Sequence, residues 1–425
     1  MKIAIIGTGI AGNVAAARLC REHDITVFEA GDHVGGHTHT HTIDDNGRSL
    51  SIDTGFIVFN DWTYPNFIAL LDELGVPSQP SEMSFGVKCE QTGLEYKGHS
   101  LNTLFAQRRN LLRPSFHRML RDILRFNREA SILLEADDQT LTLGDYLHDK
   151  HYSAAFCDYY ILPMGAAIWS AEPRRMLAFP AASFVRFFEN HGLLDIRNRP
   201  QWRVIRGGSR TYVDRLTAPF RHQIRLNTPV TGIRRQATHV EISSARHGVE
   251  RFDRVFIACH SDQALAMLRD ASPLEREILG AIPYQRNDVV LHTDISLLPR
   301  RRLAWSAWNY HRLAGDNAGV AVTYNMNLLQ GLQTQQTFLV TLNHSAAIDP
   351  DRVITRLRYE HPVFTRTGIA AQQRQTDING VNRTYFCGAY WRYGFHEDGV
   401  ISALNALDHF REKDGEQQLP LRRAG

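Results

Sequence analysis

Short apolar runs and small-residue stretches follow one another along the first forty residues. An apolar run at Ile3–Ile6 is followed by the glycine-rich Gly7–Gly12, by small residues over Asn13–Arg21, and by a second apolar run at Ile25–Phe28. Short apolar runs bounded by turns predict buried strands, and the stretch between them predicts a helix. This strand–turn–helix–strand order predicts an α/β fold that opens with a parallel sheet.

The glycine turn reads Gly7-Thr8-Gly9-Ile10-Ala11-Gly12, and the second run ends at Glu29-Ala30. Gly7 allows the tight turn, Gly9 lets a pyrophosphate approach the backbone, and Gly12 lets helix and strand pack closely. The helix N-terminus, at Ile10 and Ala11, offers unpaired N–H groups to phosphates. Glu29 lies near the ~20-residue spacing at which an acid accepts hydrogen bonds from ribose hydroxyls. The pattern favours a dinucleotide site over an ordinary glycine-rich turn.

A second glycine pair follows this acid, in the segment Gly35-Gly36-His37-Thr38. The segment resembles the FAD-binding fingerprint of the flavin-containing amine oxidase and phytoene desaturase superfamily. The resemblance implies FAD as the cofactor and a Rossmann-type FAD-binding domain. In that family an Arg often follows the glycine pair and contacts the pyrophosphate. His37 stands at this place, so the charge there is expected to be weaker or to depend on pH.

Further segments resemble the same superfamily and imply further FAD contacts. Thr54-Gly55-Phe56 resembles the strand that returns beside the flavin, and Val230 lies in a segment resembling the one that holds the adenine end. Cys259 ends a predicted buried strand. The segment 386–403 resembles the C-terminal FAD motif, whose closing helix directs its N-terminus at the flavin. In this motif the implied cofactor contacts are Gly388, His396, Gly399, Val400 and Ser402.

The same resemblance divides the chain into two domains. Residues 1–83, 201–280 and 376–425 are expected to form a discontinuous FAD-binding domain. Residues 84–200 and 281–375 are expected to form an α+β substrate domain, with Leu162–Ser170 lining the substrate cavity. The predicted elements are a helix at Tyr64–Leu74, a hairpin at Ser84–Lys97, a turn at Asn287-Asp288, and strands at Val289–Asp294, Leu303–Tyr310, Gly319–Leu328 and Thr337–Leu342.

Composition limits the class of protein. The 425 residues are 43% hydrophobic and 22% charged, with a net charge of +3. These values are ordinary for a globular protein and give no argument for a nucleic-acid partner. The five cysteines are scattered, which favours a reducing compartment. A first strand at Lys2 leaves no room for a secretory signal, and no run of ~18 apolar residues is found, so a cytoplasmic location is expected.

The stretch 101–134 is predicted to be mostly helical and divided at Pro114. Arginines alternate with apolar residues there, and Phe116, Leu120, Ile123 and Leu124 are expected to share one helical face. One interpretation is a solvated arginine face over a domain core. The other is a basic amphipathic surface that contacts an anionic membrane from the cytoplasmic side.

Three histidines alternate with threonines at His37, His39 and His41. On a strand they would share one face, which makes a metal site conceivable. No cysteine or acidic cluster accompanies them, and His37 already belongs to the segment that resembles the FAD fingerprint. We therefore predict no metal.

Two departures from the amine oxidases count against amine oxidation. Those enzymes commonly carry a lysine, water-bridged to the flavin, in the second domain, but this chain has no lysine between Lys150 and Lys413. Phe395 stands where they commonly place a tyrosine of an aromatic cage. His396, Glu397, Tyr390 and Tyr393 are the candidates for proton handling or substrate contact; alternatively, they only shape the flavin pocket.

A closer resemblance, through Gly35–Thr38, Ser306–Tyr310 and Gly394–Gly399, is to bacterial predicted NAD/FAD-binding proteins. These are often found beside cyclopropane-fatty-acid synthase-like methyltransferases, and some relatives are fatty acyl desaturases. The resemblance implies an FAD-dependent oxidoreductase that dehydrogenates or desaturates a lipid acyl chain or another apolar substrate, with an unknown electron acceptor. The alternatives are oxidation of an amine, carotenoid or porphyrin, a redox-neutral flavin isomerase, and a flavin-bearing scaffold.

Overall fold

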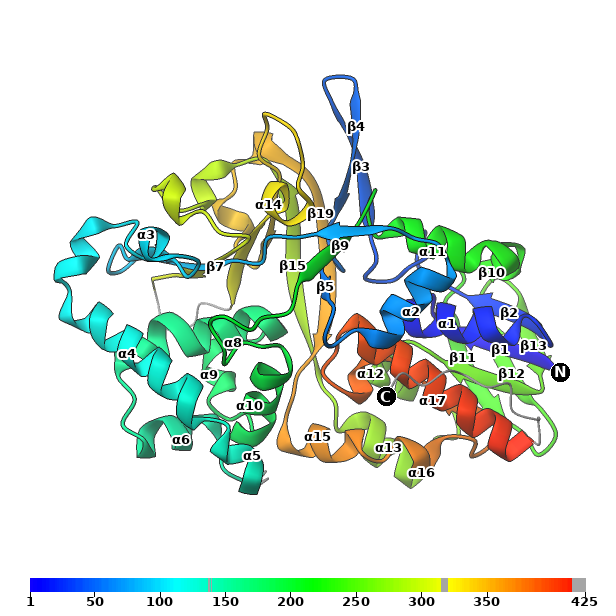
Figure 1. Cartoon of the computed structure of the whole chain (residues 1–425). Coiled ribbons are helices and arrows are strands. Elements are labelled where there is room, and N and C mark those ends of the chain that lie inside the picture. Colours follow the sequence, from blue (N-terminus) through cyan, green and yellow to red (C-terminus); the bar gives the residue numbers. More distant parts are fainter. Residues whose placement is uncertain (137, 139, 315–319, 415–425) are drawn as a thin grey trace.

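A computed structural model describes residues 1–136, 138, 140–314 and 320–414. Figure 1 shows two parts side by side, one built around a parallel sheet and one around a larger, mostly antiparallel sheet. The strands of the parallel sheet all fall within 1–83, 201–280 and 376–425, and those of the larger sheet within 84–200 and 281–375. The fold is the mixed α/β architecture that the sequence predicts.

The parallel sheet has five strands in the order β10-β2-β1-β14-β20. Its central strands are the apolar runs of the sequence, and Ile3, Val27 and Val255 are fully buried. The bounds are β1 (Lys2–Ile6), β2 (Asp24–Phe28), β10 (Ile224–Arg225), β14 (Arg254–Ile257) and β20 (Thr384–Phe386). Consecutive strands pair in parallel, so their carboxyl ends meet at one edge.

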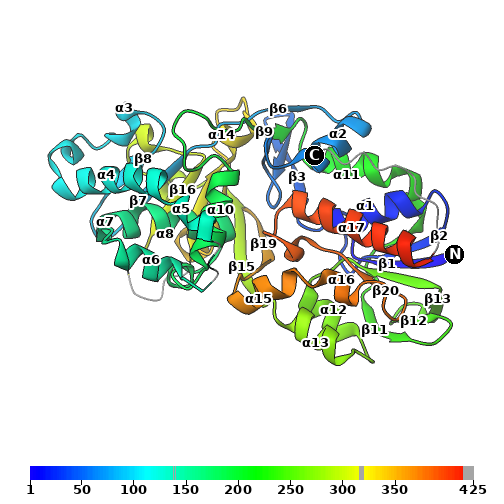
Figure 2. The ribbon, with the colours of Figure 1, turned by 60° about the horizontal axis from the view of Figure 1, so that its bottom comes forward.

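Each face of this sheet is covered. Helices α1 (Ile10–Leu19) and α17 (His396–Asp414) pack side by side on one face, together with α2 (Pro65–Glu73) and α11 (Arg210–Thr217) (Figure 2). The other face packs against a small antiparallel sheet, whose strands are β11 (Val230–Arg235), β12 (Val240–Ser244) and β13 (Gly248–Phe252). Helices α12 (Ser261–Met267), α13 (Pro273–Gly280), α15 (Arg366–Gln372) and α16 (Gln375–Ile378) border it.

The larger sheet has seven strands in the order β19-β15-β18-β17-β16-β7-β8, and only β16 and β7 pair in parallel. The bounds are β7 (Phe85–Cys89), β8 (Glu95–Lys97), β15 (Tyr284–His292), β16 (Trp308–Arg312), β17 (Ala321–Asn325), β18 (Leu339–Leu342) and β19 (Val353–Pro362). The predicted turn at Asn287-Asp288 is wrong, because β15 runs through it. The Asn287 side chain is satisfied inside the sheet, so it does not have to form a turn.

Other predicted bounds also change. Residues before Trp308 form a short 3₁₀ turn, Arg302–Ala304, and α14 (Met326–Gln330) replaces the end of the strand predicted at 319–328. Gly319 lies outside the described residues. Asn325 explains the change after β17, because its side chain accepts hydrogen bonds from the N–H groups of Asn327 and Leu328 and so caps the helix.

A group of helices packs against the seven-stranded sheet. They are α3 (Leu101–Leu104), α4 (Pro114–Glu129), α5 (Ile132–Ala136), α6 (Leu143–Asp149), α7 (Ala154–Phe156), α8 (Leu162–Trp169), α9 (Pro173–Met176) and α10 (Ala181–Asn190). Pro114 starts α4, as its missing N–H allows. The buried face of α4 carries Phe116, Met119 and Phe126, whereas Leu124 is 54% exposed. Leu124 therefore does not belong to the buried face predicted for it.

Two further elements join the parts. A three-stranded sheet places β9 (Trp202–Ile205) between β5 (Phe59–Asn60) and β6 (Ser78–Pro80), at the crossings from one part to the other. The hairpin β3 (Thr40–Asp45)–β4 (Arg48–Asp53) projects from the top of the molecule in Figure 1. Among the described residues, no helix has the length and apolar character needed to cross a membrane.

Candidate functional site

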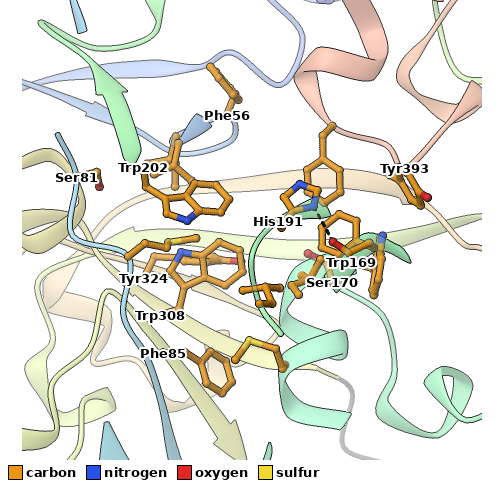
Figure 3. Close-up of a pocket in the computed structure, with 18 of the residues that line it drawn as sticks. Phe56, Ser81, Phe85, Trp169, Ser170, His191, Trp202, Trp308, Tyr324 and Tyr393 are labelled. Carbon is orange, nitrogen blue, oxygen red and sulfur yellow. Dashed lines mark hydrogen bonds between the residues drawn. The ribbon is translucent and has the colours of Figure 1, made fainter. Parts of the chain in front are cut away.

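A cavity of about 570 Å³ lies where the two parts meet. The part that holds the parallel sheet contributes His37, Thr54–Phe56 and Gly394–His396 to its wall. The seven-stranded sheet contributes Phe85, Val289, Trp308, Tyr324, Leu342, Tyr359 and His361, and the helices contribute Tyr160, Met164, Ile168, Trp169, Phe187 and His191. Figure 3 shows Trp308, Tyr324, Trp169 and Trp202 around one space. We call the end formed by His37, Thr54–Phe56 and Gly394–His396 the cofactor end, because the sequence predicts FAD contacts there, and we call the end formed by the sheet and helix side chains the substrate end.

The glycine turn leads from β1 into α1 and leaves room for a ligand. Gly7 has a φ of +101°, and a Cβ there would lie 2.9 Å from the Ala258 carbonyl oxygen. A Cβ at Gly12 would lie 2.0 Å from the Gly7 carbonyl oxygen, so only glycine allows this packing. A Cβ at Gly9 would meet no atom within 4 Å. Gly9 therefore faces open space at the N-terminus of α1, where a phosphate would approach Ile10 and Ala11.

Glu29 stands at the end of β2, followed by Ala30, and its carboxylate is held in place. Its Oε2 accepts hydrogen bonds from the N–H and the hydroxyl of Thr8, and its Oε1 accepts one from the Gly31 N–H at 2.8 Å. The backbone of Glu29 also accepts from the Thr228 N–H at 2.8 Å, two residues before Val230 at the start of β11. The acid, the glycine turn and the β11 segment therefore meet at one edge of the sheet.

The second glycine pair packs onto the first turn. Gly35 and Gly36 have φ values of +128° and +58°, and a Cβ at Gly36 would lie 3.1 Å from the Gly9 Cα. The His37 carbonyl accepts from the Phe56 N–H at 2.8 Å, and a Cβ at Gly55 would collide with the same oxygen. The two fingerprint segments and Thr54–Phe56 thus form one continuous wall at the cofactor end of the cavity.

His37 is neutral in this setting. Burial lowers its pKa well below the usual value, and the nearby His361, His260 and His396 lower it further. The expectation that its charge depends on pH is therefore replaced by a neutral imidazole at this position. A contact between His37 and a pyrophosphate would be a hydrogen bond rather than an ion pair.

The C-terminal motif closes the same site. Gly388 follows β20, and its N–H donates to the Ser402 hydroxyl at 2.8 Å. Gly399 and Val400 lie in the first turns of α17, and a Cβ at Gly399 would lie 2.5 Å from the Ile10 side chain. Cys259 follows β14 and lies beside Gly7. All the residues predicted to bind FAD are thus gathered around the carboxyl end of the parallel sheet and the cofactor end of the cavity.

The open space at the glycine turn, and the hydrogen-bonding groups around it, fit a bound FAD. Gly9 is open, the N-terminus of α1 is adjacent, and Glu29 can receive ribose hydroxyls with the lone pairs that Thr8 and Gly31 leave. The residue contacts with FAD remain a prediction.

Of the four candidate catalytic residues, His396 and Tyr393 line the cavity. His396 stacks on Phe56 at 3.5 Å between ring centroids, and its Nε2 lies 2.7 Å from the Tyr212 hydroxyl and 3.0 Å from the Thr38 hydroxyl. Burial lowers the pKa of His396 to about 3. Its Nε2 is therefore occupied in tying three segments together, which favours a pocket-shaping role for His396.

Glu397 and Tyr390 are not among the residues that line this cavity. The Glu397 carboxylate accepts from the N–H groups of Asn66 and Phe67 at 3.0 and 2.8 Å and from the Asn66 side chain at 2.7 Å. It therefore caps the N-terminus of α2. Tyr390 is buried against Trp391, with ring centroids 5.0 Å apart. These positions favour structural roles for both residues.

The alternating histidines do not share one strand face. Strand β3 begins at Thr40, so only His41 lies within it. His39 stacks between His33 and His41, at 4.0 and 4.2 Å, while His37 turns toward Tyr359 and His361 in the cavity. Among the described residues, no group of three or more His, Cys, Asp or Glu side chains could hold a metal ion.

Several lining residues were missed in the sequence. Tyr359 and His361 come from β19, where Leu357 and Tyr359 alternate with Arg358 and Glu360, and this alternation is the signal that could have revealed the strand. Asp53, which precedes the lining residue Thr54 but does not itself line the cavity, was also missed; it accepts from the Ser209 N–H and hydroxyl, and burial raises its pKa to about 6. Ser209 opens α11, so Asp53 joins the β3–β4 hairpin to the FAD-binding part.

Comparison with known proteins gives consistent matches. Residues 10–306 match the family model described as flavin containing amine oxidoreductase. A Mycobacterium tuberculosis protein provisionally named flavin-containing monoamine oxidase AofH is 27% identical over 251 residues, which are 57% of this chain and 53% of that protein. The chain thus matches about half the length of this curated relative.

Solved structures share the whole fold at low identity. Cyclohexylamine oxidase from Brevibacterium oxydans IH-35A superposes with a TM-score of 0.69 at 16% identity, covering 97% of this chain and 99% of that one. A CLA-producing fatty acid isomerase from P. acnes superposes with a TM-score of 0.67 at 17% identity, covering 96% and 98%. At these identities the likeness shows the fold alone.

Proposed function

Because the chain belongs to the flavin containing amine oxidoreductase family, we propose that it is an FAD-dependent oxidoreductase that dehydrogenates a lipid acyl chain. The glycine turn, Glu29 and the Gly35–Thr38 segment would hold FAD, which would supply the two-electron acceptor needed to form a carbon–carbon double bond in the chain. The protein residues bind and orient the chain and exclude water from it.

The character of the cavity wall is the observation that carries this proposal. Aromatic and aliphatic side chains dominate it, and none of the described residues that line it is an aspartate or glutamate. A protonated amine in an apolar cavity needs a carboxylate or a comparable partner, because an unpaired buried charge is costly. An acyl chain needs only apolar surface, and the wall from Met83 and Phe85 to Met164 and Ile168 supplies it.

One end of the cavity matches an anionic head group. Arg199 is the only lysine or arginine among the described lining residues, and it stands beside Gln201 and Ile196 in the loop between α10 and β9. Its Nε donates to the Asp195 carbonyl at 2.7 Å, which holds the guanidinium on this loop. Ile196 is 62% exposed. A carboxylate or phosphate at Arg199 would leave the acyl chain to extend inward.

The surface beside this cavity carries exposed leucines and arginines, a combination that suits contact with an anionic membrane as the source of a lipid substrate. His99 lines the cavity, and α3 begins two residues later at Leu101, which is 77% exposed. Leu111 and Leu112 are 50% and 87% exposed. Exposed arginines occur along the same stretch, at Arg108, Arg109, Arg118, Arg121 and Arg128. We propose that residues 101–134 contact an anionic membrane surface through this mixture of leucines and arginines.

The test of the substrate is the visible absorbance of the FAD-loaded protein under anaerobic conditions, titrated in parallel with phospholipids and polyamines. Bleaching by an unsaturated or methyl-branched phospholipid is expected. Bleaching by an amine instead would favour amine oxidation. Flavin that dithionite reduces but none of these compounds bleaches would favour a redox-neutral isomerase or a scaffold. A colourless protein that refuses FAD would contradict the whole proposal.

The membrane contact is tested separately by co-sedimentation with vesicles that contain phosphatidylserine. The variant Leu111→Asp/Leu112→Asp/Arg121→Glu is expected to lose binding, because it removes both the apolar and the cationic contribution. The matched control is Arg356→Glu on β19, an exposed arginine outside the surface 101–134. Equal sedimentation of all three proteins would contradict the membrane contact and leave the catalytic proposal standing.

A further inference from the structure

The imidazole of His361 stands in the cavity wall at the cofactor end. It belongs to β19, where His361 pairs with Gln285 and Tyr359 pairs with Asn287 of β15. Its ring lies 5.2 Å from the ring of His37, centroid to centroid. The ring of Tyr359, also on β19, lies 5.0 Å from that of His37, so this strand brings both His361 and Tyr359 to the fingerprint wall at the cofactor end of the cavity.

Two backbone groups hold the side-chain amide of Asn343, which follows β18. The Asp288 N–H donates to Asn343 Oδ1 at 2.9 Å, and Asn343 Nδ2 donates to the Val320 carbonyl at 3.0 Å. A backbone N–H can only donate and a carbonyl oxygen can only accept, so the orientation of the Asn343 amide is determined by its partners. Asn343 has a φ of +55°, a conformation that asparagine tolerates better than most residues.

The orientation of the Asn343 amide also fixes that of the Asn287 amide, and the Asn287 amide in turn faces His361. Asn343 Nδ2 also donates to Asn287 Oδ1 at 2.7 Å, so Asn287 must turn its Nδ2 toward His361 Nδ1, which lies at 2.9 Å. Asn287 Nδ2 reaches the Gln285 carbonyl as well, at 3.3 Å. Asn287 is fully buried, so no water is needed to complete this arrangement.

A donor that faces Nδ1 requires a lone pair on that nitrogen. Burial and the neighbouring His260 lower the pKa of His361 to about 4, so the ring is neutral at neutral pH. A neutral imidazole carries one proton, and with Nδ1 accepting, that proton is on Nε2. The chain of two asparagines therefore selects one tautomer of His361.

We propose that His361 presents a neutral Nε2–H donor to the flavin ring at the cofactor end of the cavity, and that Asn287 and Asn343 are positioning residues that hold this tautomer. The proposal rests on FAD binding as proposed above, and it does not depend on which substrate is oxidised. A neutral donor stabilises electron density that develops on the acceptor without placing a full positive charge beside an apolar substrate.

The tautomer is tested without any substrate by NMR of protein labelled with ¹⁵N in its histidine rings. The His361→Gln variant identifies the His361 signals, and wild type is expected to show a protonated Nε2 and an unprotonated Nδ1 at neutral pH. Asn287→Leu is expected to give a mixture of tautomers, whereas the cavity-lining His99→Gln leaves the His361 signals in place. A protonated Nδ1 in wild type would overturn the proposal.

The contact with the flavin is tested by the midpoint potential of the bound cofactor. His361→Phe is expected to lower the potential, because a donor that favours the reduced state is lost, and Asn287→Leu to lower it less. His99→Phe is the matched control and is expected to leave it unchanged. An unchanged potential in both FAD-loaded His361→Phe and Asn287→Leu would overturn the flavin contact. Failure of every variant and of wild type to bind FAD would instead contradict the proposed function.

Discussion

The two ends of the cavity are built in different ways. At the cofactor end, backbone groups and missing side chains make the surface, and the residues come from short contiguous segments such as Gly7–Gly12 and Gly35–Thr38. At the substrate end, side chains make the surface, and neighbours such as Phe85 and Trp308 come from strands far apart in the sequence. A surface made by the backbone depends little on individual side chains, so it can be kept while other parts of the sequence change. A surface made by side chains can change with the substrate.

The largest effect is expected at the cofactor end from Gly12→Val. The new Cβ would lie 2.0 Å from the Gly7 carbonyl oxygen, so β1 and α1 cannot keep their packing. We expect loss of FAD binding and a fall in the free energy of unfolding of at least about 3 kcal/mol. The measurements are visible absorbance and guanidinium unfolding.

Gly9→Ala is the matched control for this variant. Its Cβ meets no protein atom within 4 Å, so the fold is expected to keep its stability while the affinity for FAD falls. Equal destabilisation by both substitutions would contradict the distinction between packing and cofactor space.

A fall in pH is expected to lower the free energy of unfolding, because several histidines that line the cavity have lowered pKa values. Burial lowers the pKa of His361 and His191 to about 4 and of His396 to about 3, from an ordinary value of 6.5. At a pH between the native pKa and 6.5, each of these histidines binds a proton in the unfolded chain but not in the native protein. The free energy of unfolding therefore falls as the pH drops from 6.5 toward 4, by up to about 1.4 kcal/mol per histidine and pH unit.

Two carboxyl groups oppose this trend. Burial raises the pKa of Asp53 to about 6 and of Asp398 to about 7, so the native protein binds the extra protons and gains stability as the pH falls from 7 toward 4. Burial also lowers the pKa of His292 to about 4 and that of His311 to about 3, so these two histidines add to the loss of stability in acid. A net fall is therefore expected in the guanidinium midpoint below pH 6.5, with a smaller slope in His292→Gln. A midpoint that rises instead would show that the carboxyl groups dominate.

The substrate end is expected to lose affinity for lipid in Ile168→Asp. Ile168 lines the cavity from α8, and a carboxylate there would lose its hydration among apolar side chains, while Arg199 is the only lysine or arginine among the described lining residues. We expect the lipid concentration that half-bleaches the flavin to rise by a factor of about 10 to 100, equivalent to about 1.4–2.8 kcal/mol. The control Ile168→Met should change it little, and an unchanged value in Ile168→Asp would place the lipid elsewhere.

The smallest effect is expected from Glu397→Gln. The sequence suggests an active-site acid here, but the carboxylate caps α2. Removing its charge is expected to cost about 1 kcal/mol of stability and to leave the flavin spectrum and turnover nearly unchanged. A large loss of turnover with intact flavin would return Glu397 to the mechanism.

The difference between the two ends also explains what could be read from the sequence. The β1–α1–β2 unit follows local rules, since apolar runs, glycines and an acid at fixed spacing specify it within about thirty residues. The hairpin at 85–97 and the start of α4 at Pro114 are predicted for similarly local reasons.

Pairings between distant segments were not predictable in this way. Asn287 is typical of turns, but in the structure its amide finds partners on β19 and after β18, so β15 continues through it. Leu124 fits the apolar period of α4 but is exposed, because Met119 and Phe126 occupy the buried face. Tertiary contacts decide such positions, and one sequence does not contain them.

The position of β20 and α17 has a consequence for biosynthesis. β20 completes the parallel sheet beside β14, and α17 packs on α1 with Gly399 against Ile10. The ribosome makes β1 and α1 before residues 84–200 and 281–375, and it makes β20 and α17 after them. A nascent chain that already displays the glycine turn therefore still lacks one wall of its nucleotide pocket. Flavin is therefore expected to load after α17 has been made, rather than to guide the folding of the β1–α1 unit.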